Sequence, residues 1–279
     1  MTRNARLPVI VTDLDGTLLD FETYSPAAAR PALERARAAG WPIIFCSSKT
    51  RAEQEVYRTA LGLDEPFIVE NGAALFVPAE ARTRWFRGRT LPAVFAFGVP
   101  AHTVRKALQA IRAETGLPFR GFSEMPVAEV AARTGLDEAA AARARQRDYS
   151  ETIDAHLTPA QWQTLDEALA ARGLVRFPGG RFHTITGAGS DKGRAVRHLV
   201  HLLREAGHDV LTIGLGDSPN DAPLLRAVDR PFLVQRPDGS WADLDVPGLT
   251  RVEAAGPAGW ARVLHALLDE PGAPTSKAR

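Results

Sequence analysis

The sequence predicts an α/β fold, a doubly wound parallel sheet that forms a core, with an inserted α+β cap domain. Short apolar runs at 9–11, 41–46 and 210–214 have the length of buried parallel strands. Helical segments separate successive strands at the spacing of such a sheet. The character of the chain changes from about residue 82 to residue 187. Residues 1–81 and 188–279 are therefore predicted to form the core and 82–187 the cap.

The first half of the core alternates strands and helices. The helix after the first strand contains Pro31, so it either begins near Arg30 or kinks there. The other elements predicted in this half are a strand at 41–46, a helix at 50–61, a strand at 66–72 and its hairpin return at 73–77.

The insert mixes the two periodicities in a different order. Its predicted elements are strands at 93–98, 149–156, 174–177 and 181–186, the last two as a hairpin, and helices at 101–114, 127–134, 137–146 and 158–172. The core then resumes with an amphipathic helix from Ser190, strands at 210–214 and 231–234, and a closing helix at 260–268. The tail from Pro271 is predicted to be disordered.

Composition limits the class of protein. The chain has 279 residues, 45% hydrophobic and 24% charged, which is ordinary for a soluble protein with a sizeable core. A net charge of +1 gives no field that would attract nucleic acid or a membrane surface, so neither is expected as a partner. The single cysteine, Cys46, excludes internal disulfides and fits the cytoplasm. The sequence is compatible with a monomer or a homodimer.

Polar residues follow the predicted core strands or open a core helix. Because parallel strands place their carboxyl ends on one edge, these residues are expected to converge there. They are Asp13, Asp15, Ser47, Lys192, Asp217, Asn220 and Asp221. Carboxylates with one lysine and one hydroxyl suit a phosphoryl group and a hard cation, for which Mg²⁺ is the best candidate. For Asp13 and Asp15 alone, solvated turn or helix-capping roles are the alternative.

The predicted chemistry is covalent. Asp13 attacks phosphorus to form an aspartyl-phosphate, and Asp15 protonates the leaving alkoxide and later accepts a proton from water. Ser47 binds phosphate oxygens, and Lys192 balances the charge of the transferring group. The predicted metal ligands are Asp13, Asp15 through its carbonyl, Asp217 and Asp221.

Four short motifs resemble those of the haloacid dehalogenase superfamily of phosphatases. They are D-L-D-G-T at 13–17, a serine at 47 after the second strand, D-K-G at 191–193 and G-D-S-P-N-D at 216–221. Their order and spacing cover the core. The resemblance implies that the long insert is the cap that closes over the active site of the sugar-phosphatase branch.

Longer stretches resemble the mannosyl-3-phosphoglycerate phosphatases in particular. They are S-S-K-T-R-A-E at 47–53, P-F-I-V-E-N-G at 66–72, D-Y-S-E-T at 148–152, G-G-R-F-H at 179–183 and G-L-G-D-S-P-N-D-A-P-L at 214–224. One departure is Ser47, where threonine is commoner, but the hydroxyl is retained. The resemblance implies a phosphorylated glycoside of glycerate as substrate and a mannosylglycerate product, a compatible solute.

Such a substrate carries a phosphate, a carboxylate and hydroxyls. The resemblance implies that Lys49 and Arg51 pair with the carboxylate, although both are equally well explained as surface charges. Glu70 and Asn71 are candidates for sugar hydroxyls, against a plain hairpin turn. The remaining candidates are Asn220 in the core and Glu151, Arg181 and His183 in the cap, for which solvated cap surface is the alternative.

Other functions share parts of this pattern. A glucosyl-3-phosphoglycerate, sucrose-phosphate or hexose-phosphate phosphatase would use the same core with different cap contacts. A phosphomutase of the same fold would return the phosphate to a second hydroxyl. A non-catalytic binding module would have no need of the complete set of Asp13, Asp15, Lys192 and Asp217.

Overall fold

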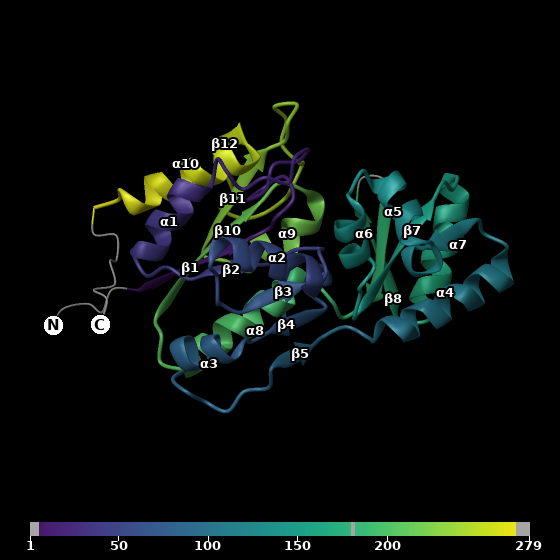
Figure 1. Cartoon of the computed structure of the whole chain (residues 1–279), viewed down its shortest axis with the longest axis horizontal. Coiled ribbons are helices and arrows are strands. Elements are labelled where there is room, and N and C mark those ends of the chain that lie inside the picture. Colours follow the sequence, from purple (N-terminus) through teal and green to yellow (C-terminus); the bar gives the residue numbers. More distant parts are fainter. Residues whose placement is uncertain (1–5, 180–181, 272–279) are drawn as a thin grey trace.

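The computed structural model describes residues 6–179 and 182–271 and places them in two lobes (Figure 1). One lobe holds the parallel sheet and both ends of the described chain, and the other is built from the inserted segment. The predicted site residue Arg181 and nearly all of the predicted disordered tail lie outside the described residues. Within the described ranges, no helix is long and apolar enough to cross a membrane.

The larger lobe is organised by a five-stranded sheet in which every neighbouring pair is parallel. Its strands, in spatial order, are β12 (Thr250–Ala255), β11 (Arg230–Gln235), β10 (Val210–Gly216), β1 (Leu7–Thr12) and β2 (Ile43–Phe45). The prediction of a doubly wound parallel sheet is confirmed. The edge strand β12 was not predicted, because its residues are mostly exposed or half-buried and form no apolar run.

Alternation along β1 explains the two layers of helices. Val9 and Val11 contribute to one hydrophobic cluster and Ile10 to the other. The first face is covered by α8 (Lys192–Glu205), α3 (Ala79–Phe86) and α9 (Ala222–Leu225), and the second by α1 (Arg30–Ala38) and α10 (Gly256–Leu268). Helix α1 begins at Arg30 with Pro31 in its first turn, which decides between the two predicted starts.

A small antiparallel sheet extends the core at the end of β2. Strands β3 (Phe67–Val69) and β4 (Ala74–Phe76) form the predicted hairpin, and β5 (Val94–Ala96) pairs with β4. A parallel bridge between Cys46 and Ile68 joins this sheet to the chain after β2. The strand predicted at 66–72 ends in a turn, as predicted, but it ends already at Val69: Glu70–Gly72 (η1) forms a short 3₁₀ turn with left-handed backbone at Glu70 and Asn71.

The second lobe contains a four-stranded antiparallel sheet, as the α+β prediction requires. In spatial order its strands are β6 (Phe119–Gly121), β7 (Ser150–Ala155), β9 (Phe182–Gly187) and β8 (Leu174–Gly179). Its helices and turns are α4 (Ala101–Thr115), η2 (Phe122–Glu124), α5 (Val127–Thr134), α6 (Glu138–Ala144) and α7 (Pro159–Ala170). Apolar residues of α4 and α7 pack with those of the sheet, and α5 and α6 form a second cluster with η2. We call this lobe the cap.

Candidate active site

The site begins where β1 ends. Asp13 follows the strand directly, and its backbone N–H donates to the carbonyl of Leu215 at the end of neighbouring β10 (2.9 Å). The sharp turn beyond it needs a glycine, because Gly16 has φ +75° and a Cβ there would lie 2.9 Å from Oδ2 of Asp217. The D-L-D-G-T sequence is thus shaped to bring β1 and β10 residues together.

Lys192 is the centre of the polar contacts at this edge. It is the first residue of α8, its side chain is 1% exposed, and its Nζ donates to Oδ1 of Asp13 (2.7 Å) and to Oδ1 of Asp221 (2.6 Å). Helix α8 can approach the backbone of Pro223 in α9 because residue 193 is a glycine: a Cβ at this position would lie only 2.2 Å from Pro223 O. Residues predicted from three separate motifs therefore meet at one ammonium group.

Three buried carboxylates gather at this edge, those of Asp13, Asp217 and Asp221, and one oxygen atom of each lies within 4.8 Å of one oxygen atom of the other two. Burial, together with repulsion from Asp221, raises the pKa of Asp13 to about 7, although Lys192 opposes the shift. Burial and the charges of Asp221 and Asp13 raise the pKa of Asp217 to about 8. One ammonium group against three buried carboxylates leaves an excess of negative charge.

The cluster fits a divalent cation. Its donors are carboxylate oxygens, the ligands that Mg²⁺ and related hard cations prefer. Asp221 is held in place by the N–H groups of Asp217 and Ser218 (3.1 Å each), and Thr17 donates to Asp217 (3.2 Å). Because the oxygens are fixed and their mutual repulsion is unrelieved, a cation would be bound by a largely pre-formed set of ligands.

Asp15 faces a different cation. Its Oδ1 lies 3.0 Å from Nζ of Lys49, whose side chain is only 9% exposed and also lies 3.6 Å from Glu53. Burial lowers the pKa of Lys49, but the carboxylates of Asp15 and Glu53 outweigh it and hold the pKa above its ordinary value. The Tyr24 ring lies beneath the ammonium, 4.8 Å from Nζ to the ring centre.

Sequence reasoning missed Glu53 and Tyr24. Glu53 had a readable signal, since it completes a capping box with Thr50 at the start of α2 (Arg51–Leu61). Tyr24 had none, because it lies in an irregular loop after β1 with left-handed backbone (φ 54°).

Ser47 lies at the end of β2, fully buried. Its Oγ accepts a hydrogen bond from the backbone N–H of Lys49 (3.2 Å), and its carbonyl accepts one from the N–H of Asn71 (3.0 Å). Asn71 in turn accepts from Nδ2 of Asn220 through its Oδ1 (3.3 Å). Ser47, Asn71 and Asn220 are thus linked in one hydrogen-bonded chain beside the acidic cluster.

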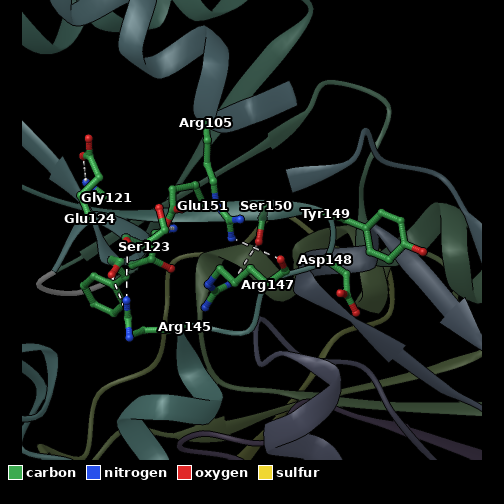
Figure 2. A network of polar contacts seen from close by, with 12 residues as sticks. Arg105, Gly121, Ser123, Glu124, Arg145, Arg147, Asp148, Tyr149, Ser150 and Glu151 are labelled. Carbon is green, nitrogen blue, oxygen red and sulfur yellow. Dashed lines mark hydrogen bonds and ion pairs between the residues drawn. The ribbon is translucent and has the colours of Figure 1, made fainter. Parts of the chain in front are cut away.

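The other predicted substrate residues have partners elsewhere. Glu151, 3% exposed in its side chain, pairs with Nε of Arg105 (2.7 Å) inside the cap (Figure 2). His183 contacts the Trp162 ring and Arg176 of the same lobe. Arg51 is half exposed and pairs with Glu55 on α2 (3.4 Å). Glu70 accepts hydrogen bonds from the start of β7. The contacts of these residues do not bring them to the acidic cluster.

Comparison with known proteins identifies the family. A model of haloacid dehalogenase-like hydrolases matches residues 10–86. A glucosyl-3-phosphoglycerate/mannosyl-3-phosphoglycerate phosphatase of Methanococcoides burtonii is 40% identical over 264 residues, 93% of this chain and 97% of the relative. A mannosyl-3-phosphoglycerate phosphatase of Pyrococcus furiosus is 38% identical over 230 residues, 81% and 90% of the two chains.

The chain belongs to the mannosyl-3-phosphoglycerate phosphatase family of haloacid dehalogenase-like hydrolases. The predicted family and the predicted reaction class, hydrolysis of a phosphoric monoester, are confirmed, since these relatives are phosphatases. Solved structures agree on the fold. A Thermoplasma acidophilum protein covers 94% of this chain and 98% of its own at a TM-score of 0.68 and 17% identity. The match with a haloalkanoate-superfamily phosphatase of Bacteroides thetaiotaomicron covers 96% of each chain, with a TM-score of 0.63 and 18% identity.

Proposed function

We propose that this member of the family hydrolyses mannosyl-3-phosphoglycerate, or its glucosyl analogue, to the glycosylglycerate and phosphate. The observation that carries the proposal is the buried cluster of Asp13, Asp217 and Asp221 around the end of β1. The ammonium of Lys192 donates to Asp13 (2.7 Å) and to Asp221 (2.6 Å) of this cluster. The names of relatives that match over most of the chain supply the substrate.

In the first half of the proposed reaction, Asp13 is the nucleophile. Lys192 holds its Oδ1, and Oδ2 attacks phosphorus while the ester P–O bond breaks. Asp15 gives its proton to the departing alkoxide of the glycerate. In the second half, a water attacks the aspartyl-phosphate, Asp15 takes the water's proton, and phosphate leaves with Asp13 regenerated. Ser47 and Lys192 donate to the phosphoryl oxygens as charge develops.

A divalent cation, proposed as Mg²⁺, would be held by Asp13 and Asp217, with the Asp15 carbonyl and Asp221 completing or orienting its ligands. When bound, it would neutralise charge on the phosphoryl group and on Asp13. Without a cation, the excess of carboxylates would repel the phosphate dianion. The reducing cytoplasm is the proposed location, on the ground of the single, buried cysteine.

Substrate selection is proposed for the cap, which is the second lobe, formed from the insert predicted at 82–187, acting on the core proposed at 1–81 and 188–279. Within the predicted insert, β5 pairs with β4 of the core and not with the cap sheet. Lys49, beside Asp15, is proposed to meet the glycerate carboxylate, and Asn71, beside Ser47, is proposed to meet a sugar hydroxyl. Arg51, Asn220, Glu151 and His183 stay predictions as further substrate contacts, whereas the carboxylate of Glu70 already accepts hydrogen bonds from residues 148–150. Closing the cap would exclude bulk water from the acyl-phosphate.

A panel of phosphate esters tests the proposal. Purified protein with Mg²⁺ is assayed for phosphate release from mannosyl- and glucosyl-3-phosphoglycerate, sucrose phosphate, a hexose phosphate and p-nitrophenyl phosphate. We expect the highest kcat/KM for one of the glycosyl-phosphoglycerates. The Asp13→Asn variant should release no phosphate from any ester of the panel. A higher kcat/KM for sucrose phosphate or hexose phosphate would refute the substrate. Isomerised product without free phosphate would indicate a mutase.

A further inference from the structure

Residues 148–150, which we call the junction segment, connect the cap to the core in both directions. They lead into β7, and their backbone carbonyls accept hydrogen bonds from the two ends of the insert. Asp148 O accepts from the N–H of Ala101 at the start of α4 (2.8 Å), and Tyr149 O accepts from the hydroxyl of Thr186 near the end of β9 (3.0 Å). The junction segment therefore ties together the chain entering the cap and the chain leaving it.

Three donors of the junction segment go to one residue of the core. Oε1 of Glu70 accepts from the N–H of Asp148 (2.8 Å), and Oε2 accepts from the N–H of Tyr149 (3.1 Å) and from the hydroxyl of Ser150. Glu70 is fully buried. A buried carboxylate with three donors is a strongly directional anchor. Figure 2 shows the junction segment with Arg147, whose guanidinium also donates to Ser150 (3.0 Å) and to the carbonyl of Ser48 (3.3 Å).

The backbone at Glu70 is held in an unfavourable conformation. Glu70 and Asn71 both have left-handed backbone, with φ 50° and 59°. Such conformations are unfavourable for residues other than glycine and persist where surrounding contacts impose them. Here the N–H of Glu70 donates to Lys49 O (3.1 Å) and that of Asn71 to Ser47 O (3.0 Å). The turn is fixed on the loop that carries the phosphate-site serine.

The two side chains of this turn point to different parts of the molecule. Glu70 binds the junction segment, while Asn71 accepts from Asn220 beside the acidic cluster. The next residue, Gly72, has no room for a side chain, since a Cβ would lie 2.2 Å from the backbone of Asp191, immediately before Lys192. The cap, the phosphate-site loop and the start of α8 are consequently joined through three consecutive residues.

The geometry points to Glu70 as a positioning residue that sets the cap over the reacting groups by holding the junction segment. Its carboxylate acts on the cap backbone and not on the substrate. The inference rests on the proposed function for the reaction it serves, but the contact itself is independent of which ester is hydrolysed.

The test compares Glu70→Gln with Glu65→Gln. Glu65 is a second buried core glutamate, and it accepts from the Asp64 N–H and contacts no cap residue that the structure describes. Amide hydrogen exchange of the full-length protein follows Asp148 and Tyr149. Steady-state kinetics with Mg²⁺ compare mannosyl-3-phosphoglycerate with p-nitrophenyl phosphate, which is too small to need the cap. Glutamine replaces one acceptor by an N–H₂ group, so one of the two amides loses its partner.

For Glu70→Gln we expect exchange at Asp148 or Tyr149 to accelerate by about tenfold or more, and KM for the glycoside to rise by a similar factor, the usual effect of removing one partner of a buried hydrogen bond. Turnover of p-nitrophenyl phosphate should stay within about twofold, and Glu65→Gln should leave every readout within that range. Ser150→Ala removes the hydroxyl that donates to Glu70 and accepts from Arg147 but leaves both backbone donors in place. It should give smaller changes in the same direction, and it serves as the test if Glu70→Gln does not fold.

Two results would overturn the inference. Unchanged exchange with a raised KM would place Glu70 on the substrate itself. Equal loss of activity on both esters would place it in the chemistry of the core. If the wild type does not hydrolyse mannosyl-3-phosphoglycerate, the proposed function fails, and the exchange measurement and the p-nitrophenyl phosphate control still decide the role of Glu70.

Discussion

Buried carboxylates in the core and in the cap differ in how their charge is balanced. In the core, Asp13, Asp217 and Asp221 share one buried ammonium, that of Lys192. In the cap, Glu151 forms an ion pair with the guanidinium of Arg105 and also accepts hydrogen bonds from backbone N–H groups. An ion pair with balanced charge stabilises the fold without a bound ligand. A cluster with more carboxylates than cations costs stability unless a further cation binds there.

The largest effect is expected from removing the cation of each region in turn, with Lys192→Met against Arg105→Met. Lys192→Met leaves Asp13 and Asp221 buried without a cation, so we expect activity on p-nitrophenyl phosphate to fall by about 100-fold or more. Arg105→Met should lower the melting temperature and keep that activity within about threefold, since Arg105 serves the cap alone.

Circular dichroism checks that both variants fold, and phosphate release measures the activity. Equal losses of activity in the two variants would remove the distinction between a reactive core cluster and a stabilising cap pair.

An intermediate effect is expected from pH and metal. The pKa values of Asp13 and Asp217, about 7 and 8 in the folded chain, lie above the unfolded value of 3.8. The folded state therefore binds these protons more tightly, and the stability they provide is present below pH 4 and is lost as pH rises through about 8.

Without Mg²⁺, this contribution should make the melting temperature lower at about pH 8.5 than at about pH 6, and saturating Mg²⁺ should raise it more at the higher pH. Thermal unfolding of the wild type is compared with that of Asp217→Asn, which should lose much of both dependences. A Mg²⁺ effect that is equal in wild type and variant would count against Asp217 as a ligand.

The smallest effect is expected in the cap. His183 packs on Trp162 and beside Arg176, and burial and the Arg176 charge lower its pKa, which keeps the ring neutral near pH 7. If the ring also meets the sugar, His183→Ala should raise KM for mannosyl-3-phosphoglycerate by about threefold to tenfold and leave p-nitrophenyl phosphate hydrolysis unchanged. An unchanged KM would assign His183 to cap packing alone.

Local spacing was enough to predict most of the core. The run before Asp13, the capping signal at Thr50 and the glycine-bounded G-D-S-P-N-D segment each specify their own backbone, and parallel strands bring their ends together. The contact of Asp13 with Lys192 joins residues 179 positions apart, yet strand order made it predictable.

The side-chain contacts within the cap and at the junction segment could not be predicted from local spacing. Alternation shows that residues of β7 and β9 occupy two faces, but it does not show that Glu151 meets Arg105 on one of them. At Glu70 the sequence E-N-G is typical of a turn, and nothing local shows that the side chain reaches across to the amide groups of Asp148 and Tyr149. These contacts depend on how two separately folded sheets are placed.

We propose that the excess of carboxylates in the core cluster serves to make Asp13 a nucleophile. Protein mixed with Mg²⁺ and mannosyl-3-phosphoglycerate, or p-nitrophenyl phosphate, is quenched in acid during turnover, and its peptides are analysed by mass spectrometry. We expect a phosphoryl group on the side chain of Asp13, and no such group in Asp13→Asn or in protein without substrate. Steady phosphate release with no phosphorylated Asp13, or with the phosphoryl group on another residue, would contradict it.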